Sequence, residues 1–131
     1  MEFELTWIDS SRVVCRTSGT ASAKDYAALL RALTSSPEFG PDVKVLMDFR
    51  ALDVSSVTAA DMEKIAILRA RFASEVNFRS AMVVGPGGLK YGLGRMFQSY
   101  ATAQMELEVS VFHTFDEGMA WLQADDVEPA P

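Results

Sequence analysis

Residues 43–50 read Val-Lys-Val-Leu-Met-Asp-Phe-Arg, and this stretch decides the fold class of the 131-residue chain. In an extended strand, successive side chains point to opposite faces. The odd-numbered residues of the stretch are all apolar, whereas Leu46 is the one apolar residue among the even-numbered ones. A parallel strand that is covered by helices on both faces is apolar on both. The stretch therefore predicts a sheet with helices on one face and a more polar opposite face.

Five strands and four helices are predicted around this stretch. Residues 2–7 and 12–17 alternate apolar with polar side chains on either side of Asp9-Ser10-Ser11, which indicates a β-hairpin. The second strand of the hairpin and each later strand are followed by a segment with apolar residues at spacings of three and four, which indicates a helix. The remaining strands are expected at 43–50, 78–85 and 107–111. This order predicts an α/β fold: a five-stranded mixed sheet, with an N-terminal hairpin and then β-α units, and four helices packed largely on one face.

Three of the predicted helices begin with a capping-box pattern, in which a hydroxyl residue is followed three positions later by an acidic one. The pairs are Ser22 with Asp25, Thr58 with Asp61, and Thr114 with Glu117. We expect these caps to fix the helix starts, and we expect a single domain over residues 1–124. Residues 125–131 are acidic and contain proline, which predicts a disordered tail.

The polar strand residues are expected to share one side of the sheet that carries no helix. On that side, opposite charges on neighbouring strands could pair. The residues concerned are Arg12, Arg16, Lys44, Asp48 and Glu108.

The composition excludes several classes of partner. The formal net charge of −6 disfavours a binder of duplex nucleic acid, which needs a basic surface. No apolar run approaches the roughly 20 residues that span a bilayer, so no stable membrane insertion is expected. The acidic stretch at residues 1–5 lacks the pattern of a signal peptide. The chain has a single cysteine, Cys15, and cannot form an internal disulfide, which favours the reducing cytoplasm.

Two polar features near strand ends are candidate ligand sites. Asp48 and Arg50 lie at the carboxyl end of the third strand, where open α/β sheets bind ligands. The alternative is a local ion pair that ties down the following loop. Gly85-Pro86-Gly87-Gly88 followed by Lys90 suggests a phosphate loop, but it matches neither G-x-x-x-x-G-K-[ST] nor G-x-G-x-x-G. A tight strand-to-helix turn is the favoured interpretation.

The sequence offers no set of residues for catalysis. His113 is the only histidine, and Cys15 falls on the apolar side of its strand with Val13, as a small buried hydrophobic residue would. A Ser-His-Asp or Cys-His arrangement would need this one histidine and a suitable partner. We therefore expect a protein that is not an enzyme and that needs no metal and no cofactor.

The chain resembles the SpoIIAA-like family of small bacterial proteins, which are relatives of STAS domains and similar in fold to CRAL-TRIO lipid carriers. The resemblance covers most of residues 1–124. It is carried by Val45-Leu46-Met47-Asp48-Phe49-Arg50, Lys90-Tyr91-Gly92-Leu93-Gly94-Arg95-Met96-Phe97, Val111-Phe112 and Ala120-Trp121-Leu122. It implies a mixed sheet with helices largely on one side. In STAS-type regulators a serine at the start of the second helix is phosphorylated. The corresponding residues 54–59 here lack the Asp-Ser pair and the glycine of that motif.

Two hypotheses for function follow. The first is a non-catalytic cytoplasmic binding module that holds a small apolar or amphipathic ligand between the third helix and the sheet. Arg50 or Arg95 would hold an acidic head group, with Asp48 nearby, although a stripe of this kind is more often plain core. The residues of the third helix in this prediction are Tyr91, Leu93, Met96, Phe97 and Tyr100.

The second hypothesis is a protein-interaction regulator of the anti-sigma-factor-antagonist type, switched by phosphorylation in the loop over residues 53–58. The candidate phosphoacceptors are Ser55, Ser56 and Thr58. A regulatory protein partner is expected in this case. A homodimer fits both hypotheses, because an open sheet face or an exposed apolar helix needs cover.

Overall fold

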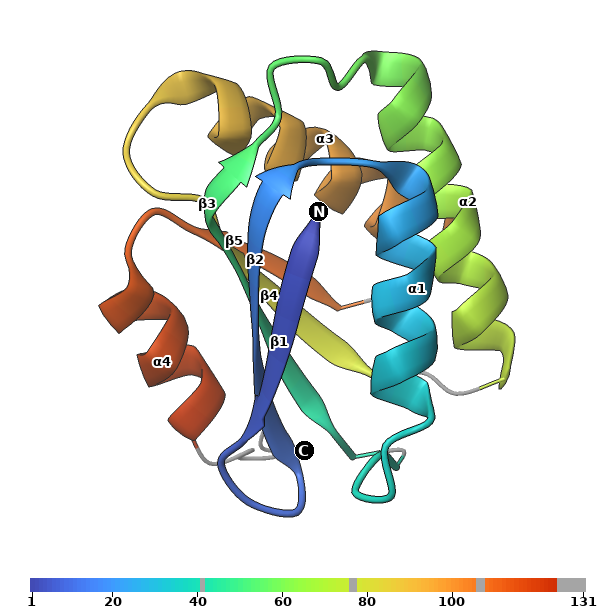
Figure 1. Cartoon of the computed structure of the whole chain (residues 1–131), viewed down its shortest axis with the longest axis vertical. Coiled ribbons are helices and arrows are strands. Elements are labelled where there is room, and N and C mark those ends of the chain that lie inside the picture. Colours follow the sequence, from blue (N-terminus) through green and yellow to red (C-terminus); the bar gives the residue numbers. More distant parts are fainter. Residues whose placement is uncertain (41, 76–77, 106–107, 125–131) are drawn as a thin grey trace, which may run out of the picture.

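The structure is a computed structural model that describes residues 1–40, 42–75, 78–105 and 108–124, and it contains one five-stranded sheet (Figure 1). The strands lie in the sheet in chain order, with β1 antiparallel to β2 and the other neighbouring pairs parallel. This is the mixed sheet that the sequence predicted. The strands are β1 (Glu2–Trp7), β2 (Arg12–Thr20), β3 (Lys44–Asp53), β4 (Arg79–Val83) and β5 (Val109–Phe112). The helices are α1 (Ala23–Thr34), α2 (Ala59–Glu75), α3 (Gly88–Met105) and α4 (Phe115–Gln123).

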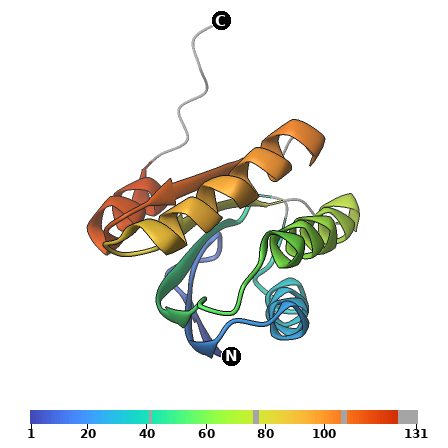
Figure 2. The ribbon, with the colours of Figure 1, turned by 90° about the horizontal axis from the view of Figure 1, so that it is seen from above.

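Helices α1, α2 and α3 lie on one face of the sheet and α4 lies on the other (Figures 1 and 2). The larger core lies between the sheet and the first three helices. Its strand residues alternate as the pattern at residues 43–50 predicted, because Val43, Val45 and Met47 all point into it. Buried leucines of α1 fill the space between that helix and the strands.

The expectation of a sheet face without a helix is wrong, because α4 covers part of that face. The face is apolar where β3 and β4 meet: Leu46, Ala81 and Val83 are fully buried there, together with Leu122 of α4. The sequence pattern of β3 alone does not reveal this apolar patch, because two residues of the patch, Ala81 and Val83, belong to β4. The helix approaches closely at Gly118, where an added Cβ would lie 2.5 Å from Val83 Cγ2 and 2.8 Å from Leu46 Cδ1.

Two charged residues of that face are consequently buried beside α4. Lys44 is 5% exposed and donates from Nζ to the carbonyl oxygens of Trp121 (2.7 Å) and Ala124 (3.3 Å) at the end of the helix. Asp48 is 6% exposed and is held by Arg50. Burial of both side chains is tolerable because each has charge-assisted hydrogen bonds.

The three predicted helix caps are confirmed. The hydroxyl oxygens of Ser22, Thr58 and Thr114 accept hydrogen bonds from the backbone N–H three residues later. At the starts of α2 and α4 the acidic partner also accepts from the cap backbone, which completes the box. The predictions that fall on Val76, Leu107 and the tail 125–131 lie outside the described residues.

Candidate functional site

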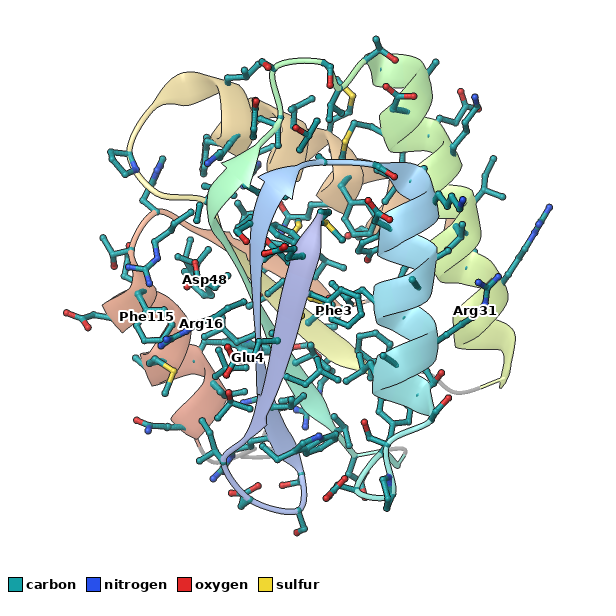
Figure 3. The ribbon with its side chains drawn as sticks, viewed as in Figure 1. Phe3, Glu4, Arg16, Arg31, Asp48 and Phe115 are labelled. Atoms are coloured by element: carbon teal, nitrogen blue, oxygen red, sulfur yellow. The ribbon has the colours of Figure 1, made fainter. Side chains whose placement is uncertain are left out.

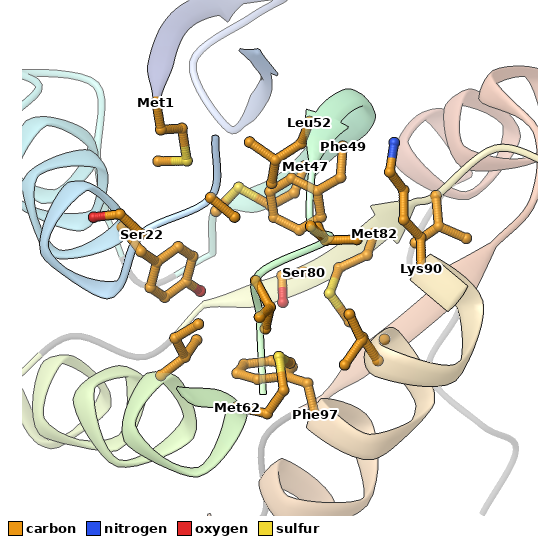
Figure 4. Close-up of a pocket in the computed structure, with 18 residues that line it drawn as sticks. Met1, Ser22, Met47, Phe49, Leu52, Met62, Ser80, Met82, Lys90 and Phe97 are labelled. Atoms are coloured by element: carbon orange, nitrogen blue, oxygen red, sulfur yellow. The ribbon is translucent and has the colours of Figure 1, made fainter. Parts of the chain in front are cut away.

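An apolar cavity opens at the carboxyl ends of the parallel strands, on the side of the sheet that carries α1, α2 and α3 (Figure 4). Its volume is about 90 Å³. Open α/β sheets generally bind ligands at this edge. One side consists of Met47, Phe49 and Leu52 of β3, Ser80 and Met82 of β4, and Val84 directly after β4. The other sides consist of Met1, Ala21, Ser22, Tyr26, Val54, Val57, Met62, Ile65, Lys90, Leu93, Gly94 and Phe97.

The lining of the apolar cavity is rich in methionine. Met1, Met47, Met62 and Met82 all line it and come from four separate segments of the chain. Methionine side chains are flexible and polarisable, so they adapt to ligands of different shape. Sequence analysis missed this feature. The seven methionines in the composition were its one visible signal.

Few polar groups reach the apolar cavity. The hydroxyl of Ser80 points into it in Figure 4. Lys90 lies at its rim, but its Nζ donates to the carbonyl oxygen of Arg50 at 2.7 Å, so it contributes mainly its aliphatic stem. Tyr26 adds a phenol, and burial raises the pKa of this hydroxyl to about 12, so it is neutral at pH 7.

A β-bulge shapes the strand side of the cavity. Arg16 of β2 is paired with Asp48 of β3, whereas Ser18 is paired with Ala51, so β3 contains one extra residue between the two pairs. Phe49 and Leu52 are three residues apart and would point to opposite faces of a regular strand. Because of the bulge, both line the cavity. The hydroxyl of Thr17, opposite the bulge, donates to the carbonyl oxygen of Asp48 at 3.0 Å.

Asp48 and Arg50 lie on the other side of the sheet, facing α4. Arg50 donates from Nε and Nη2 to the two carboxylate oxygens of Asp48, each at 2.9 Å, and its backbone N–H donates to the same group at 3.2 Å. Burial raises the pKa of Asp48, but the hydrogen bonds and charge of Arg50, together with the charge of Arg16, lower it by more, so this pKa lies below its usual value. The guanidinium carbons of Arg50 and Arg16 lie 4.6 Å and 5.5 Å from the centroid of the Phe115 ring. Figure 3 shows Arg16 beside Phe115. The structure thus shows the local ion pair that was the alternative interpretation.

The predicted residues of α3 are divided between four environments. Leu93 and Phe97 line the apolar cavity. Met96 and Tyr100 pack against the main core, and Arg95 is exposed. Tyr91 stacks on the ring of His113 with 4.2 Å between centroids, and the Nδ1 of that histidine lies 3.2 Å from the carbonyl oxygen of Gly85.

The glycine-rich segment before α3 is a tight turn. Gly85 and Gly87 have φ angles of 79° and 108°, which residues with a side chain rarely adopt. The segment therefore connects β4 to α3 in the way that the favoured interpretation of the sequence predicted.

The loop with the candidate phosphoacceptors borders the cavity. Ser55 and Ser56 are exposed, and Val54 and Val57 of the same loop line the cavity. Ser56 also lines a second hollow, of about 110 Å³, that shares Val57 with the apolar cavity. Thr58, by contrast, is occupied in the cap of α2.

The described part of the chain contains neither a metal-binding cluster nor a membrane-spanning helix. There, no three side chains of His, Cys, Asp or Glu gather closely enough to hold a metal ion. None of the described helices is both long and apolar enough to cross a membrane.

These features define a mixed α/β protein with the SpoIIAA-like fold. Over 92% of both chains, it is similar to an uncharacterised protein of the DUF3478 family with a SpoIIAA-like fold from Shewanella loihica PV-4, with a TM-score of 0.56 and 21% identity. It is also similar to the anti-sigma factor antagonist SpoIIAA in its unphosphorylated form, with a TM-score of 0.50 and 13% identity. That match covers 93% of this chain and 96% of SpoIIAA. No family model and no curated protein sequence matches.

Proposed function

We propose that this protein is a non-catalytic binding module that holds a small apolar or amphipathic ligand in the apolar cavity. The observation that supports the proposal best is the cavity itself, which is open, methionine-lined and placed at the carboxyl edge of the sheet. Its volume of about 90 Å³ is smaller than the roughly 150 Å³ of an apolar cavity that binds benzene. The enclosed part of the ligand is therefore a chain or ring fragment of a few atoms.

The arginines first considered for a head group do not line this cavity. Arg50 is paired with Asp48 on the opposite face, and Arg95 is exposed on α3. The proposal therefore keeps Leu93 and Phe97 as contacts and adds Tyr26, Met62 and other residues from outside α3.

The chemistry of the lining favours binding over reaction. Among the described lining residues, the side chains with N–H or O–H are those of Ser22, Tyr26, Ser80 and Lys90, and no histidine or carboxylate lines the cavity as a base. The N-terminal ammonium of Met1 is paired with Asp25 at 2.9 Å. We accordingly propose that the protein works in the cytoplasm without a cofactor and without binding nucleic acid, and that it forms a homodimer. The free, buried Cys15 supports the cytoplasm, and the net charge of −6 disfavours the binding of nucleic acid.

The methionine methyl groups provide a direct test. We would titrate protein labelled with 13C at these methyl groups with 1-hexanol and record NMR spectra. The resonances of Met47, Met62 and Met82 should shift, whereas that of Met119, which packs on the α4 side, should not. Equal shifts at all four methyl groups, or none, would contradict the proposal.

A matched pair of α2 variants sharpens the test. Ile65 lines the cavity, whereas Ile67 is 46% exposed. Ile65→Trp should fill the cavity and abolish the shifts, and Ile67→Trp should leave them unchanged. Retained binding in the first variant would place the ligand elsewhere.

The second candidate is a protein-interaction regulator switched by phosphorylation in the loop before α2. The exposure of Ser55 and Ser56 beside the cavity mouth favours it. A phosphate there would repel the carboxylate of Asp53, which accepts a hydrogen bond from the Ser55 backbone, and would so disturb the loop. The double change Ser55→Ala with Ser56→Ala should prevent modification by a cognate kinase. Partner binding that is identical for alanine and phosphomimetic versions would exclude the switch.

A further inference from the structure

Arg69 of α2 is a buried guanidinium with a donor that is not used. The residue is 1% exposed, and its Nη2 donates to the carbonyl oxygen of Phe78 at 2.8 Å. The guanidinium carbon lies 3.6 Å from the centroid of the Phe78 ring. The buried Nη1 has no hydrogen-bond partner among the residues that the structure describes.

A buried charge of this kind needs compensation, because an isolated ion in a low-dielectric interior is strongly disfavoured. The ring of Phe78 and one carbonyl oxygen supply part of it. No described carboxylate makes an ion pair with Arg69. The described titratable group that acts on it is Tyr26, which is neutral at pH 7 and cannot balance the charge.

Tyr26 connects this guanidinium to the apolar cavity. The phenol lines the cavity, and it also interacts electrostatically with Arg69. The guanidinium is not itself part of the cavity lining. Arg69 also follows Ile65 of the cavity lining by four residues, so the two side chains lie one helical turn apart on the same face of α2. A group that passes the phenol on this side of the cavity would therefore approach Arg69.

We propose that the ligand of the apolar cavity is a carboxylic acid with a short alkyl chain, and that its carboxylate binds to Nη1 of Arg69 and the hydroxyl of Tyr26. This inference rests on the function proposed above and adds the chemical class of the ligand. The carboxylate of the ligand thus points inward, and its alkyl chain lies against the methionines of the cavity. A single charge suits the site, because one unused guanidinium donor and one hydroxyl would leave the second charge of a phosphate monoester unbalanced.

The opposite orientation, with the acid at the rim, is less favourable. The cations among the described lining residues are Lys90 and the N-terminal ammonium of Met1. The Nζ of Lys90 already donates to the carbonyl oxygen of Arg50, and the ammonium is paired with Asp25 at 2.9 Å. An ion pair at a solvent-accessible rim contributes little. A carboxylate beside Arg69 would instead supply the missing partner of a fully buried charge.

Three probes of equal chain length test the inference: hexanoate, 1-hexanol and hexylammonium, each titrated at pH 7 and followed by the methionine methyl resonances. The wild-type protein should bind hexanoate about tenfold or more tightly than 1-hexanol, because a charge-assisted hydrogen bond replaces a neutral one. Hexylammonium should not bind. Equal affinity for hexanoate and 1-hexanol would overturn this inference but leave the apolar binding function standing. Failure of all three probes to bind would overturn both.

Two variants locate the carboxylate. Arg69→Met should abolish the preference for hexanoate while 1-hexanol still binds, and Tyr26→Phe should reduce the affinity for hexanoate several-fold. A preference that survives Arg69→Met would overturn the assignment. If Arg69→Met does not fold, Tyr26→Phe still decides, since unchanged hexanoate affinity in that variant would contradict the proposed contact.

Discussion

The Nζ of Lys44 lies 2.7 Å from the carbonyl oxygen of Trp121, so the first residue of β3 holds the last turn of α4. The ammonium also lies 4.6 Å from the centroid of the Trp121 ring. A cation at a helix C-terminus is stabilising, because it meets carbonyl groups that have no partner within the helix. This contact explains how a buried lysine is tolerated at the start of a strand.

Lys44→Met should loosen α4 from the sheet. The variant keeps most of the aliphatic bulk but removes the charged donor, and hydrogen bonds of this kind contribute about 1.5–3 kcal/mol. Urea unfolding should show a loss of that size, and amide hydrogen exchange should accelerate in α4 first. Lys24→Met is the control, because Lys24 is exposed on α1. Equal exchange in both variants would mean that Lys44 does not anchor the helix.

Two helical glycines should respond to alanine in opposite directions. At Gly92 of α3 an added Cβ would meet no atom within 4 Å, so Gly92→Ala should stabilise the protein by up to about 1 kcal/mol through helix propensity. At Gly118 the Cβ would clash with Val83 and Leu46, and overpacking of this kind costs about 1–3 kcal/mol. Thermal unfolding of the two variants measures the contrast. A stable Gly118→Ala protein would show that α4 can shift away from the sheet.

The pair of Asp48 and Arg50 predicts a dependence of stability on pH. Burial raises the folded-state pKa of Asp48, and the interactions with Arg50 and Arg16 lower it. The net result is a folded-state pKa below the unfolded value of about 3.9. A carboxyl group with a lowered pKa contributes stability above its unfolded pKa, and this contribution is lost as the pH falls through the folded pKa. Arg50→Met should remove it. The Arg50 side chain is 45% exposed, so solvent screening limits the loss at pH 7 to about 1 kcal/mol.

Urea unfolding of wild type and Arg50→Met between pH 7 and pH 3 tests this prediction. The difference in unfolding free energy should be constant near neutrality and should shrink below about pH 4. Arg95→Met, at an exposed position of α3, should differ little from wild type over the whole range. A difference for Arg50→Met that does not change with pH would show that the pair does not set the pKa of Asp48.

The elements of the fold could be predicted from the sequence because their signals are local. Alternation over six to eight residues marks the strands, and a hydroxyl residue three positions before an acidic one marks the helix starts. The position of α4 could not be predicted in this way. It depends on an apolar patch that Leu46 shares with Ala81 and Val83 of another strand, which forms only when the sheet is assembled.

The candidate site was predictable only in part for the same reason. Leu93 and Phe97 were found because they belong to one helix with a readable stripe. Tyr26, Met47 and Met62 come from three different elements, and no spacing in the sequence connects them to one another. The bulge that brings both Phe49 and Leu52 to the cavity depends on the pairing of β3 with β2, which the sequence of β3 does not contain.

Arg69 should reduce the stability of the empty protein. Its unpaired charge is buried, and replacing buried ionic groups with apolar ones of similar size is often neutral or stabilising by about 1–4 kcal/mol. The carbonyl oxygen of Phe78 loses a donor in Arg69→Met, so we expect a net gain of about 1 kcal/mol in urea unfolding without ligand. Saturating hexanoate should then stabilise wild type more than the variant, because a ligand stabilises the state that binds it. A variant that is less stable than wild type without ligand, and that gains as much from hexanoate as wild type does, would mean that Arg69 serves the packing against Phe78 and not a ligand.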